Sequence, residues 1–488
     1  MNKMNRRKFL GVCGLGAAAS LGGLSLAEAT ILPKPKEAES FDVVVIGAGL
    51  AGLSAACQAA ELGAKVAVLE KVGEDKTGGN SALAGGTVVM PGSEDQKDKD
   101  FYYNALKDKS LSRGNNEIIR AIADDVVRDM MWLRGLGVGF TDPAKQAGYP
   151  GNTAVFLPGA YRGVPVALKK IREVIAEKGG KFFHETKAQQ LVLDENGSVV
   201  GVRAMTKSGM KDFIGKSVVI ATGGYAANKE ILETFVDQDA DEMMVRGDKK
   251  ATGDGLFLGK EAGASWIGMG GMAGMHVAAV SPLNTAAGNP TNRALFFCLG
   301  INREGKRYVD ESRGYVANGK ASMKQPGQTI ALIYDEALKK QNGVMFAVNL
   351  FSNLGIEILE ADSLEELAEK IQVPPDALKK TVSEFNDAVE DGNTAPKANP
   401  PKMQHAYKIE TSKFYALYPL VPGIALTFGG LKIDDKGRVL QADGTVIPGL
   451  YAAGEGAGAP FYEDYVGGAS LANCLVMGRR AGNSAAGK

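Results

Sequence analysis

A glycine-rich turn near the N-terminus constrains the fold more than any other feature of this sequence. The apolar run 41–46 predicts a buried parallel strand, and the turn Gly47-Ala48-Gly49-Leu50-Ala51-Gly52 follows it directly. Residues 53–62 then predict a helix, and residues 66–69 a second strand. Glycines in this pattern permit a tight turn, close approach of the backbone to a pyrophosphate, and close packing of helix on strand. The segment therefore predicts a β-α-β unit of the doubly wound type that holds a dinucleotide.

An acidic residue at the end of the second strand supports this interpretation. Glu70 stands where a carboxylate can accept hydrogen bonds from ribose hydroxyls. The acid, with Lys71 next to it, favours a 2′-hydroxyl over a 2′-phosphate. A glycine turn with a purely structural role is the alternative, and the strand before it and the helix after it argue against that alternative.

Three further glycine-rich segments follow in the chain. They are Gly78-Gly79-Asn80-Ser81-Ala82-Leu83-Ala84-Gly85-Gly86, then Ala221-Thr222-Gly223-Gly224-Tyr225 at the end of a predicted strand, and Thr252-Gly253-Asp254-Gly255 at the start of a predicted helix. A fourth, Pro448-Gly449-Leu450-Tyr451-Ala452-Ala453-Gly454-Glu455, lies near the C-terminus. In this order the segments resemble the flavoprotein subunits of the succinate dehydrogenase, fumarate reductase and flavocytochrome c superfamily, over residues 41–482.

The resemblance implies an α/β fold, with a doubly wound, Rossmann-like FAD-binding domain and an inserted α+β capping domain. It assigns Gly47, Gly49, Gly52 and Glu70 to the adenosine end of FAD, Asn80, Ser81, Ala84 and Gly85 to the isoalloxazine ring, and Ala221, Thr222, Gly223, Asp254, Gly454, Glu455, Ser470 and Leu471 to the rest of the site. Four further candidates for FAD binding stand within the same segments: Ala51, Lys71, Gly79 and Gly86. Membrane-bound members carry a His near the position of Asn80 that bonds covalently to FAD. Because this chain has Asn there, we expect non-covalent FAD.

The domain boundaries are read from shifts in composition. We expect a signal peptide at 1–29, a linker at 30–40, the FAD-binding domain at 41–271 and 421–488, and the capping domain at 272–420. Within these domains the periodicity predicts helices at 116–136, 165–178, 364–371 and 376–389, a hairpin at 190–204, and strands at 218–221, 424–433 and 449–453.

The substrate face is predicted from the resemblance as well. The segment from Ile301 to Glu311 resembles the family segment that supplies the proton donor of fumarate reductases, which implies that role for Arg307. A guanidinium is a weak acid, so it would have to be desolvated and resupplied with protons. The alternative is an arginine that pairs locally with Asp310 or Glu311. His276 is a candidate substrate contact, since reductases of this family often place a His after the segment that holds Gly263.

Two departures from the family pattern argue against fumarate as the substrate. Residues 422–430 read Pro-Gly-Ile-Ala-Leu-Thr-Phe-Gly-Gly, without the His pair that fumarate reductases carry there. Residues 464–469 place Tyr465 at the position of a carboxylate-binding Arg. A Tyr at this point is similar to tricarballylate and 3-ketosteroid dehydrogenases, in which a phenol can polarise a carbonyl or exchange a proton. Leu426, Phe428, Phe461 and Tyr462 beside Tyr465 would suit a larger or less charged substrate, although such residues are as often plain core.

The N-terminus reads as an export signal. Basic residues at 3–8 precede an apolar, Ala- and Gly-rich stretch at 9–26, and Ala27-Glu28-Ala29 offers a cleavage site. The run Asn5-Arg6-Arg7-Lys8-Phe9-Leu10 resembles the twin-arginine signal, which predicts a periplasmic protein. A lone N-terminal membrane anchor is the alternative, but the stretch is short and Gly-rich for one.

Composition limits the classes of function. Because 56 basic residues balance 56 acidic ones, no strong field favours nucleic acid or anionic lipid. The sequence shows no Cys-rich cluster or haem motif and no metal-ligand cluster, so a separate donor such as a cytochrome c or quinol-linked protein would exchange electrons with FAD.

We therefore expect a periplasmic oxidoreductase acting on CH–CH bonds, an enoate reductase of anaerobic respiration. A tricarballylate or 3-ketosteroid type dehydrogenase, and an electron-transfer flavoprotein without its own substrate, remain alternatives. The substrate, the direction and the choice between Arg307 and Tyr465 as proton-transfer residue stay open.

Overall fold

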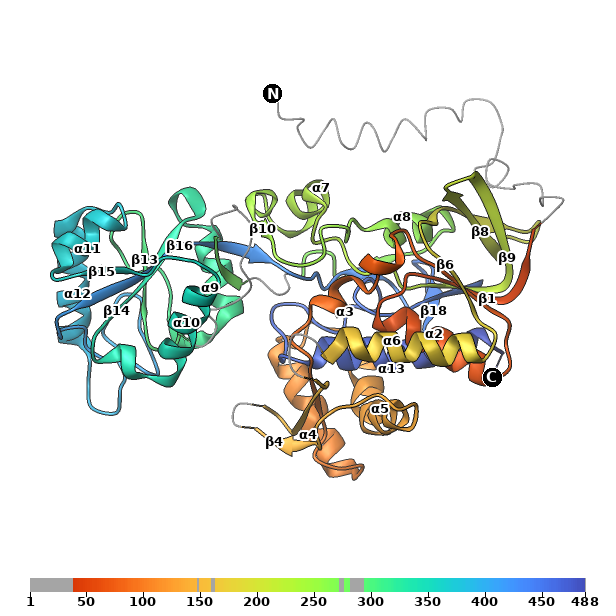
Figure 1. The fold of residues 1–488 in the computed structure, drawn as a ribbon, viewed down its shortest axis with the longest axis horizontal. Coiled ribbons are helices and arrows are strands. Elements are labelled where there is room, and N and C mark those ends of the chain that lie inside the picture. Colours follow the sequence, from red (N-terminus) through yellow and green to blue (C-terminus); the bar gives the residue numbers. More distant parts are fainter. Residues whose placement is uncertain (1–37, 147–148, 159–162, 272–275, 281–293, 488) are drawn as a thin grey trace.

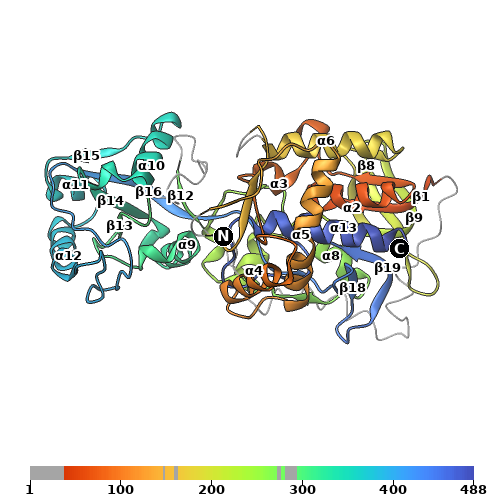
Figure 2. The same ribbon diagram turned by 90° about the horizontal axis from the view of Figure 1, so that it is seen from below.

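The computed structural model describes residues 38–487 except 147–148, 159–162, 272–275 and 281–293. Two lobes lie side by side along the long axis of the molecule, and both views separate them (Figures 1 and 2). The larger lobe holds the predicted glycine turn, and the smaller lobe is formed mainly by the middle of the chain.

The larger lobe is built on an 8-stranded sheet. Its parallel core has the order β19-β9-β1-β2-β6, and the strands are β1 (Ser40–Ile46), β2 (Val66–Leu69), β6 (Lys181–Phe183), β9 (Gly209–Ile220) and β19 (Val446–Ala452). Strand β18 (Arg438–Leu440) extends it antiparallel to β19, and the hairpin of β7 (Lys187–Leu193) and β8 (Val199–Thr206) joins through β9. The parallel core with its buried, β-branched strands is the doubly wound fold expected from the sequence.

Helices cover the sheet of the larger lobe. Helices α2 (Leu50–Glu61), α6 (Gly163–Glu177) and α13 (Ala469–Ala485) pack together, and α13 also contacts α5 (Asn116–Gly135) and the sheet (Figure 1). Small residues permit the contact of α13 with α2: a Cβ on Gly478 would lie 2.5 Å from the carbonyl oxygen of Ala51. The remaining elements of this lobe are α3 (Gly79–Leu83), α4 (Gln96–Lys109), α7 (Lys229–Ile231), α8 (Asp254–Glu261), β11 (Trp266–Ile267), β17 (Gly430–Leu431), and the small sheet of β3 (Thr87–Met90), β4 (Ala144–Lys145) and β5 (Asn152–Val155).

The smaller lobe, which we call the cap, holds a mainly antiparallel 6-stranded sheet. It consists of β10 (Met244–Val245), β12 (His276–Ala279), β13 (Leu299–Asn302), β14 (Ile330–Asp335), β15 (Leu359–Ala361) and β16 (Phe414–Ile424), with α9 (Tyr315–Met323), α10 (Asn342–Asn353), α11 (Leu364–Lys370) and α12 (Pro375–Ala388) around it. Strand β16 pairs with β10, β12, β14 and β15, so it is the centre of this sheet. The cap also has its own apolar core, which includes Phe351 and Phe385.

One local prediction was wrong, and a second gave only part of a longer strand. Residues 424–433 were expected to form a strand, but β16 ends at Ile424, and residues 425–429 form no regular element before the short β17. The predicted strand 218–221 is the end of the longer β9, whose first half pairs with β8 and whose second half pairs with β1 and β19. Periodicity misses both features because strand ends depend on partners that are distant in sequence.

Candidate active site

A cavity of about 1200 Å³ runs from the ends of the parallel strands to the cap. It exceeds the roughly 300–1,000 Å³ of a site for one drug-sized ligand. All of the predicted cofactor residues except Gly52 line it. The cavity therefore has room for a dinucleotide and for a second, smaller molecule.

The glycine turn forms the floor of one end of this cavity. Gly47 has a φ of +105°, and a Cβ there would lie 2.4 Å from the carbonyl oxygen of Ala221. Gly52 does not line the cavity: a Cβ there would lie 2.0 Å from the carbonyl oxygen of Gly47, so it permits helix α2 to pack on the turn. A Cβ on Gly49 would meet nothing closer than 3.6 Å. The start of α2 is thus open to an anion, as expected for a pyrophosphate site.

Acidic residues organise the same end of the cavity. The carboxylate of Glu70 accepts hydrogen bonds from the backbone N–H of Ala48 at 3.0 Å and of Val72 at 3.2 Å, so it fixes the turn while it lines the cavity. Asp254 forms an ion pair with Lys71 at 2.8 Å. Burial alone would raise the pKa of Asp254, but the hydrogen bond and charge of Lys71 hold it below its usual value.

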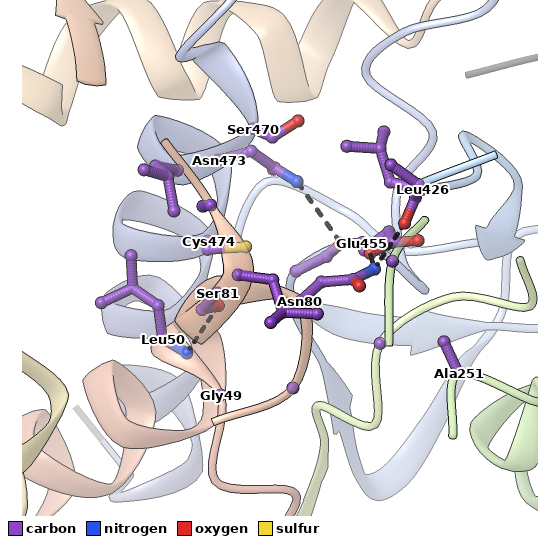
Figure 3. Close-up of a pocket in the computed structure, with 18 of the residues that line it drawn as sticks. Gly49, Leu50, Asn80, Ser81, Ala251, Leu426, Glu455, Ser470, Asn473 and Cys474 are labelled. Carbon is purple, nitrogen blue, oxygen red and sulfur yellow. Dashed lines mark hydrogen bonds between the residues drawn. The ribbon is translucent and has the colours of Figure 1, made fainter. Parts of the chain in front are cut away.

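Asn80 joins three segments at the middle of the cavity (Figure 3). Its Nδ2 donates to the carbonyl oxygen of Ala425 and to Oε2 of Glu455, both at 2.9 Å, and its Oδ1 accepts from the N–H of Asp248 at 2.6 Å. The other carboxylate oxygen of Glu455 accepts from the N–H of Thr427 at 2.9 Å. Burial raises the pKa of Glu455 to about 7, although the bonds from Asn80 and Thr427 oppose the shift.

An aromatic wall lies where the cavity meets the cap. The ring of Tyr465 lies 5.6 Å from that of Phe428, 5.8 Å from that of Phe461 and 6.3 Å from that of Tyr315, between ring centroids. These separations are those of favourable edge and tilted contacts. We use "aromatic wall" for these four residues, of which Tyr315 comes from the cap and the others from the larger lobe.

The two phenols of the wall interact with each other. Burial raises the pKa of Tyr465, while its hydrogen bond with Tyr315 and the charge of Arg246 oppose that rise. Burial also raises the pKa of Tyr315, to well above its usual value, and the bond with Tyr465 adds to the shift. The two hydroxyls are thus hydrogen-bonded partners, and either of them can donate. The hydroxyl of Tyr149 is close by, because it and that of Tyr315 would each lie 3.7 Å from a Cβ on Gly467.

Comparison with known proteins identifies the family. A family model described as "FAD binding domain" matches residues 42–470. The chain belongs to this FAD-binding family. The expected fold class, cofactor and enzyme class, an FAD-dependent oxidoreductase acting on CH–CH bonds, are thereby confirmed.

Several relatives of this FAD-binding chain are reductases by name. It is 28% identical to the fumarate reductase (cytochrome) of Shewanella frigidimarina, over 92% of this chain and 77% of that protein. It is also 28% identical to the vinyl phenol reductase of Lactiplantibacillus plantarum, over 92% of this chain and 97% of that protein. The NADH:acrylate oxidoreductase of Vibrio harveyi is 29% identical over 92% of this chain, which spans only 50% of that protein.

Solved structures have the same fold. The open conformation of a flavocytochrome c3 fumarate reductase superposes with a TM-score of 0.75 and 25% identity, over 99% of this chain and 81% of the other. The 3-ketosteroid-Δ4-(5α)-dehydrogenase of Rhodococcus jostii RHA1 superposes with a TM-score of 0.74 and 24% identity, over 93% and 98% of the two chains. At that identity the second likeness shows the fold alone.

The residues present fit FAD. The open helix start can receive the pyrophosphate, Glu70 lies at the position for ribose, and the cluster around Asn80 and Glu455 lies further along the same cavity. The predicted FAD residues are thus brought together. Their individual contacts with FAD remain predictions, as does the non-covalent attachment inferred from Asn80.

The structure corrects the placement of Arg307. Its side chain is only 1% exposed and does not line the cavity. It donates to both carboxylate oxygens of Glu311, at 3.1 and 2.8 Å, and to the carbonyl oxygens of Val309 and Pro400, and its guanidinium lies over the ring of Phe385. This is the alternative of a local ion pair with Glu311, and in this structure the guanidinium is enclosed in the cap, away from the cavity lining.

Tyr465 lies on the cavity as predicted, and Tyr315, Tyr149, Arg246 and Arg313 are cavity residues that the sequence analysis missed. Tyr315 and Arg313 follow closely after the Arg307 segment, so an aromatic residue beside a cation at that point was a usable signal. Tyr149 and Arg246 gave none, because each stands in an irregular segment.

Some predictions concern parts of the chain that the structure does not describe. His276 is the first residue of β12, opposite Gly423, but its side chain lies outside the described part, and its substrate contact stays a prediction. The signal peptide 1–29 and most of the linker lie outside it as well. Among the described residues, no helix is long and apolar enough to cross a membrane, and no group of His, Cys, Asp and Glu could hold a metal ion.

Proposed function

We propose that this protein is a reductase of activated carbon–carbon double bonds that uses FAD and a separate electron donor. The names of its relatives, which include fumarate, acrylate and vinyl phenol reductases, support this class of substrate. The cavity also extends beyond the FAD residues to the aromatic wall, which favours an enzyme with an organic substrate over an electron-transfer flavoprotein without one.

The single observation that carries the mechanism is the hydrogen bond between Tyr315 and Tyr465 at the cavity. A phenol that accepts one hydrogen bond keeps its own proton for another acceptor. When Tyr465 is the acceptor in this pair, its own proton is free for a substrate in the cavity, and Tyr315 is the residue that resupplies it. This assigns proton transfer to Tyr465, with Tyr315 behind it, and leaves Arg307 with a structural role.

The FAD supplies the hydride when it is bound and reduced, and the chain supplies the proton. The pKa of Tyr465 is raised by burial, so its hydroxyl stays protonated at neutral pH and acts as an acid. The charge of Arg246 favours the phenolate that forms when the proton leaves. Phe428 and Phe461 pack against the ring and hold its orientation.

The reverse direction is the second candidate, because a tyrosine pair can also remove a proton. The structural likeness to a 3-ketosteroid dehydrogenase is in accord with it. In that case Tyr465 would act as the base. Arg246 would then favour the phenolate needed before hydrogen is removed.

Substitution of the tyrosines tests the proposal on the FAD-loaded enzyme. With reduced viologen as donor and an alkene that the enzyme reduces, Tyr465→Phe should lower kcat by about 10² or more, the scale of general acid catalysis. Tyr315→Phe should lower kcat less than Tyr465→Phe does, since the variant keeps the hydroxyl of Tyr465 and loses only the residue that resupplies its proton. Tyr462→Phe is the matched control, because the Tyr462 ring packs under the guanidinium of Arg113 and is not part of the Tyr315–Tyr465 pair. Normal kcat in Tyr465→Phe would contradict the assignment. Faster turnover with an oxidising dye and a saturated substrate would favour the dehydrogenase.

We also propose export to the periplasm and electron delivery by a cytochrome c or a quinol-linked protein. The twin-arginine pattern at Arg6 and Arg7 supports the first proposal, and the flavocytochrome likeness supports the second. Replacing both arginines by lysine should retain the protein in the cytoplasm, as measured by cell fractionation. Equal periplasmic amounts of the unaltered protein and of the double lysine variant would overturn the export proposal.

A further inference from the structure

The basic residues that line the cavity differ in whether they form ion pairs. Each cavity lysine forms an ion pair with an aspartate, at distances of 2.7 to 3.7 Å: Lys71 and Lys187 with Asp254, Lys109 with Asp464, and Lys250 with Asp248. Arg246 packs its side chain against Gly423 and takes part in further interactions. Arg313 differs from these, because it is exposed and has no ion pair with any described residue.

Arg313 stands close to the aromatic wall along the chain. It ends the turn Glu311–Arg313, and Tyr315 of the wall begins the next helix two residues later. Two interactions hold this turn. Glu311 forms a buried ion pair with Arg307, and Oδ1 of Asp310 accepts a hydrogen bond from the N–H of Ser312 at 2.9 Å. One segment of the cap thus brings Arg313 and the Tyr315 ring of the wall to the same cavity.

The remainder of the wall is apolar. Phe428 is 2% exposed and Phe461 is 3% exposed, and their rings contact each other as well as Tyr465. Leu426 and Val316 line the cavity beside them. Such a surface binds a flat, apolar group through edge contacts and area burial, and it offers a carboxylate only the two phenol hydroxyls.

We propose that the substrate is an enoate with one carboxylate and an aryl group on its double bond. This inference rests on the proposed reductase function. Arg313 binds the carboxylate through its paired N–H donors, and the aryl group lies on the aromatic wall. A dicarboxylate needs a second cationic anchor, whereas the other cavity cations are already engaged, the lysines with aspartates and Arg246 in its own interactions. A neutral polycyclic ketone would leave Arg313 without a partner.

The reaction balances with this assignment. The π bond of the alkene breaks, one carbon receives a hydride from the reduced cofactor, and the other receives the proton of the Tyr465 hydroxyl. Two electrons from a one-electron donor and two protons from solvent restore the enzyme. The product is the saturated aryl carboxylate.

Four probes test the substrate class on the FAD-loaded enzyme with reduced viologen: 3-phenylacrylate, its methyl ester, acrylate and fumarate. We expect kcat/KM for 3-phenylacrylate to exceed that for each of the others by about 10-fold or more. In Arg313→Gln, the preference for the acid over its ester should fall by about 10-fold or more, the scale of one charge-assisted hydrogen bond. Lys306→Gln, which removes an exposed cation of the same segment, is the control and should keep the preference.

A binding measurement separates the anchor from the chemistry. The saturated acid 3-phenylpropanoate should perturb the absorption of the oxidised flavin with a Kd that rises about 10-fold or more in Arg313→Gln. An unchanged Kd and an unchanged preference would overturn Arg313 as the anchor. Preference for fumarate or acrylate would overturn the aryl substrate while the reductase function stands. Failure to reduce any alkene, together with dye-linked oxidation of a ketosteroid, would overturn the proposed function itself.

Discussion

Replacing Arg307 by alanine removes a charge from the interior of the cap. Glu311 is fully buried, and among the described residues it would keep as partners only the N–H of Gly300 at 2.9 Å and the ammonium of Lys402 at 3.7 Å. Burial lowers the pKa of Lys402, so it is a poor substitute as a counter-ion. Breaking one side of a buried ion pair costs about 3–5 kcal/mol, and two backbone carbonyls lose a donor as well. We expect the free energy of unfolding of the cap to fall by at least about 3 kcal/mol.

Urea unfolding of the FAD-loaded protein, followed by circular dichroism, measures this loss. Lys306→Ala is the matched control, because its side chain is 66% exposed and its ion pair with Glu304 lies on the surface, where such pairs contribute about 1 kcal/mol or less. If Arg307 were the proton donor instead, Arg307→Ala would have a stability near that of the control and a turnover lower by about 10². That result would refute the structural role of Arg307.

Four other predictions concern the FAD site. Gly52→Ala should abolish FAD binding or folding, because its Cβ would lie 2.0 Å from a carbonyl oxygen; normal flavin content would contradict this close packing. Glu70→Lys should weaken FAD binding, since the N–H of Ala48 loses its acceptor and Lys71 gains a like charge; flavin titration of the apoprotein measures the Kd. The flavin should stay in solution after acid precipitation of the protein, and yellow precipitate would show a covalent bond. Burial raises the pKa of Glu455 from 4.5 to about 7. Between these two pH values the folded apoprotein therefore keeps a proton on Glu455 that the unfolded chain has released. Its stability should therefore fall as the pH rises through that interval, and urea titrations should show no such fall for Glu455→Gln.

The FAD end of the site was predictable because its constraints are local. Gly47 must adopt a positive φ, and Gly52 must admit a backbone oxygen, so the residue types are fixed by a few neighbouring atoms. Residues 41–46 and 66–69 were read as buried parallel strands from their unbroken apolar runs, and they form β1 and β2. Glu70 followed from its place at the end of β2.

The substrate end was not predictable in the same way. Arg307 and Tyr315 belong to one short segment of the cap, and the sequence does not tell which of them faces the cavity. That choice depends on Glu311, Pro400 and Phe385, which enclose Arg307 from other parts of the cap. The loop 425–429 was misread as a strand for a related reason: its backbone is held by Asn80 and Glu455, residues far away in the sequence.

The proton pair itself depends on how the two lobes meet. Tyr315 begins helix α9 of the cap, whereas Tyr465 belongs to the larger lobe, so their hydrogen bond exists only while the cap is in this position. The same helix is tied to the larger lobe by Lys320, which binds Glu463 beside the wall, and by Lys324, which binds Asp237 and Asp239. Movement of the cap away from the cavity would break these ion pairs and the tyrosine pair together. The proposed proton path through Tyr315 and Tyr465 is therefore complete only in this arrangement of the two lobes.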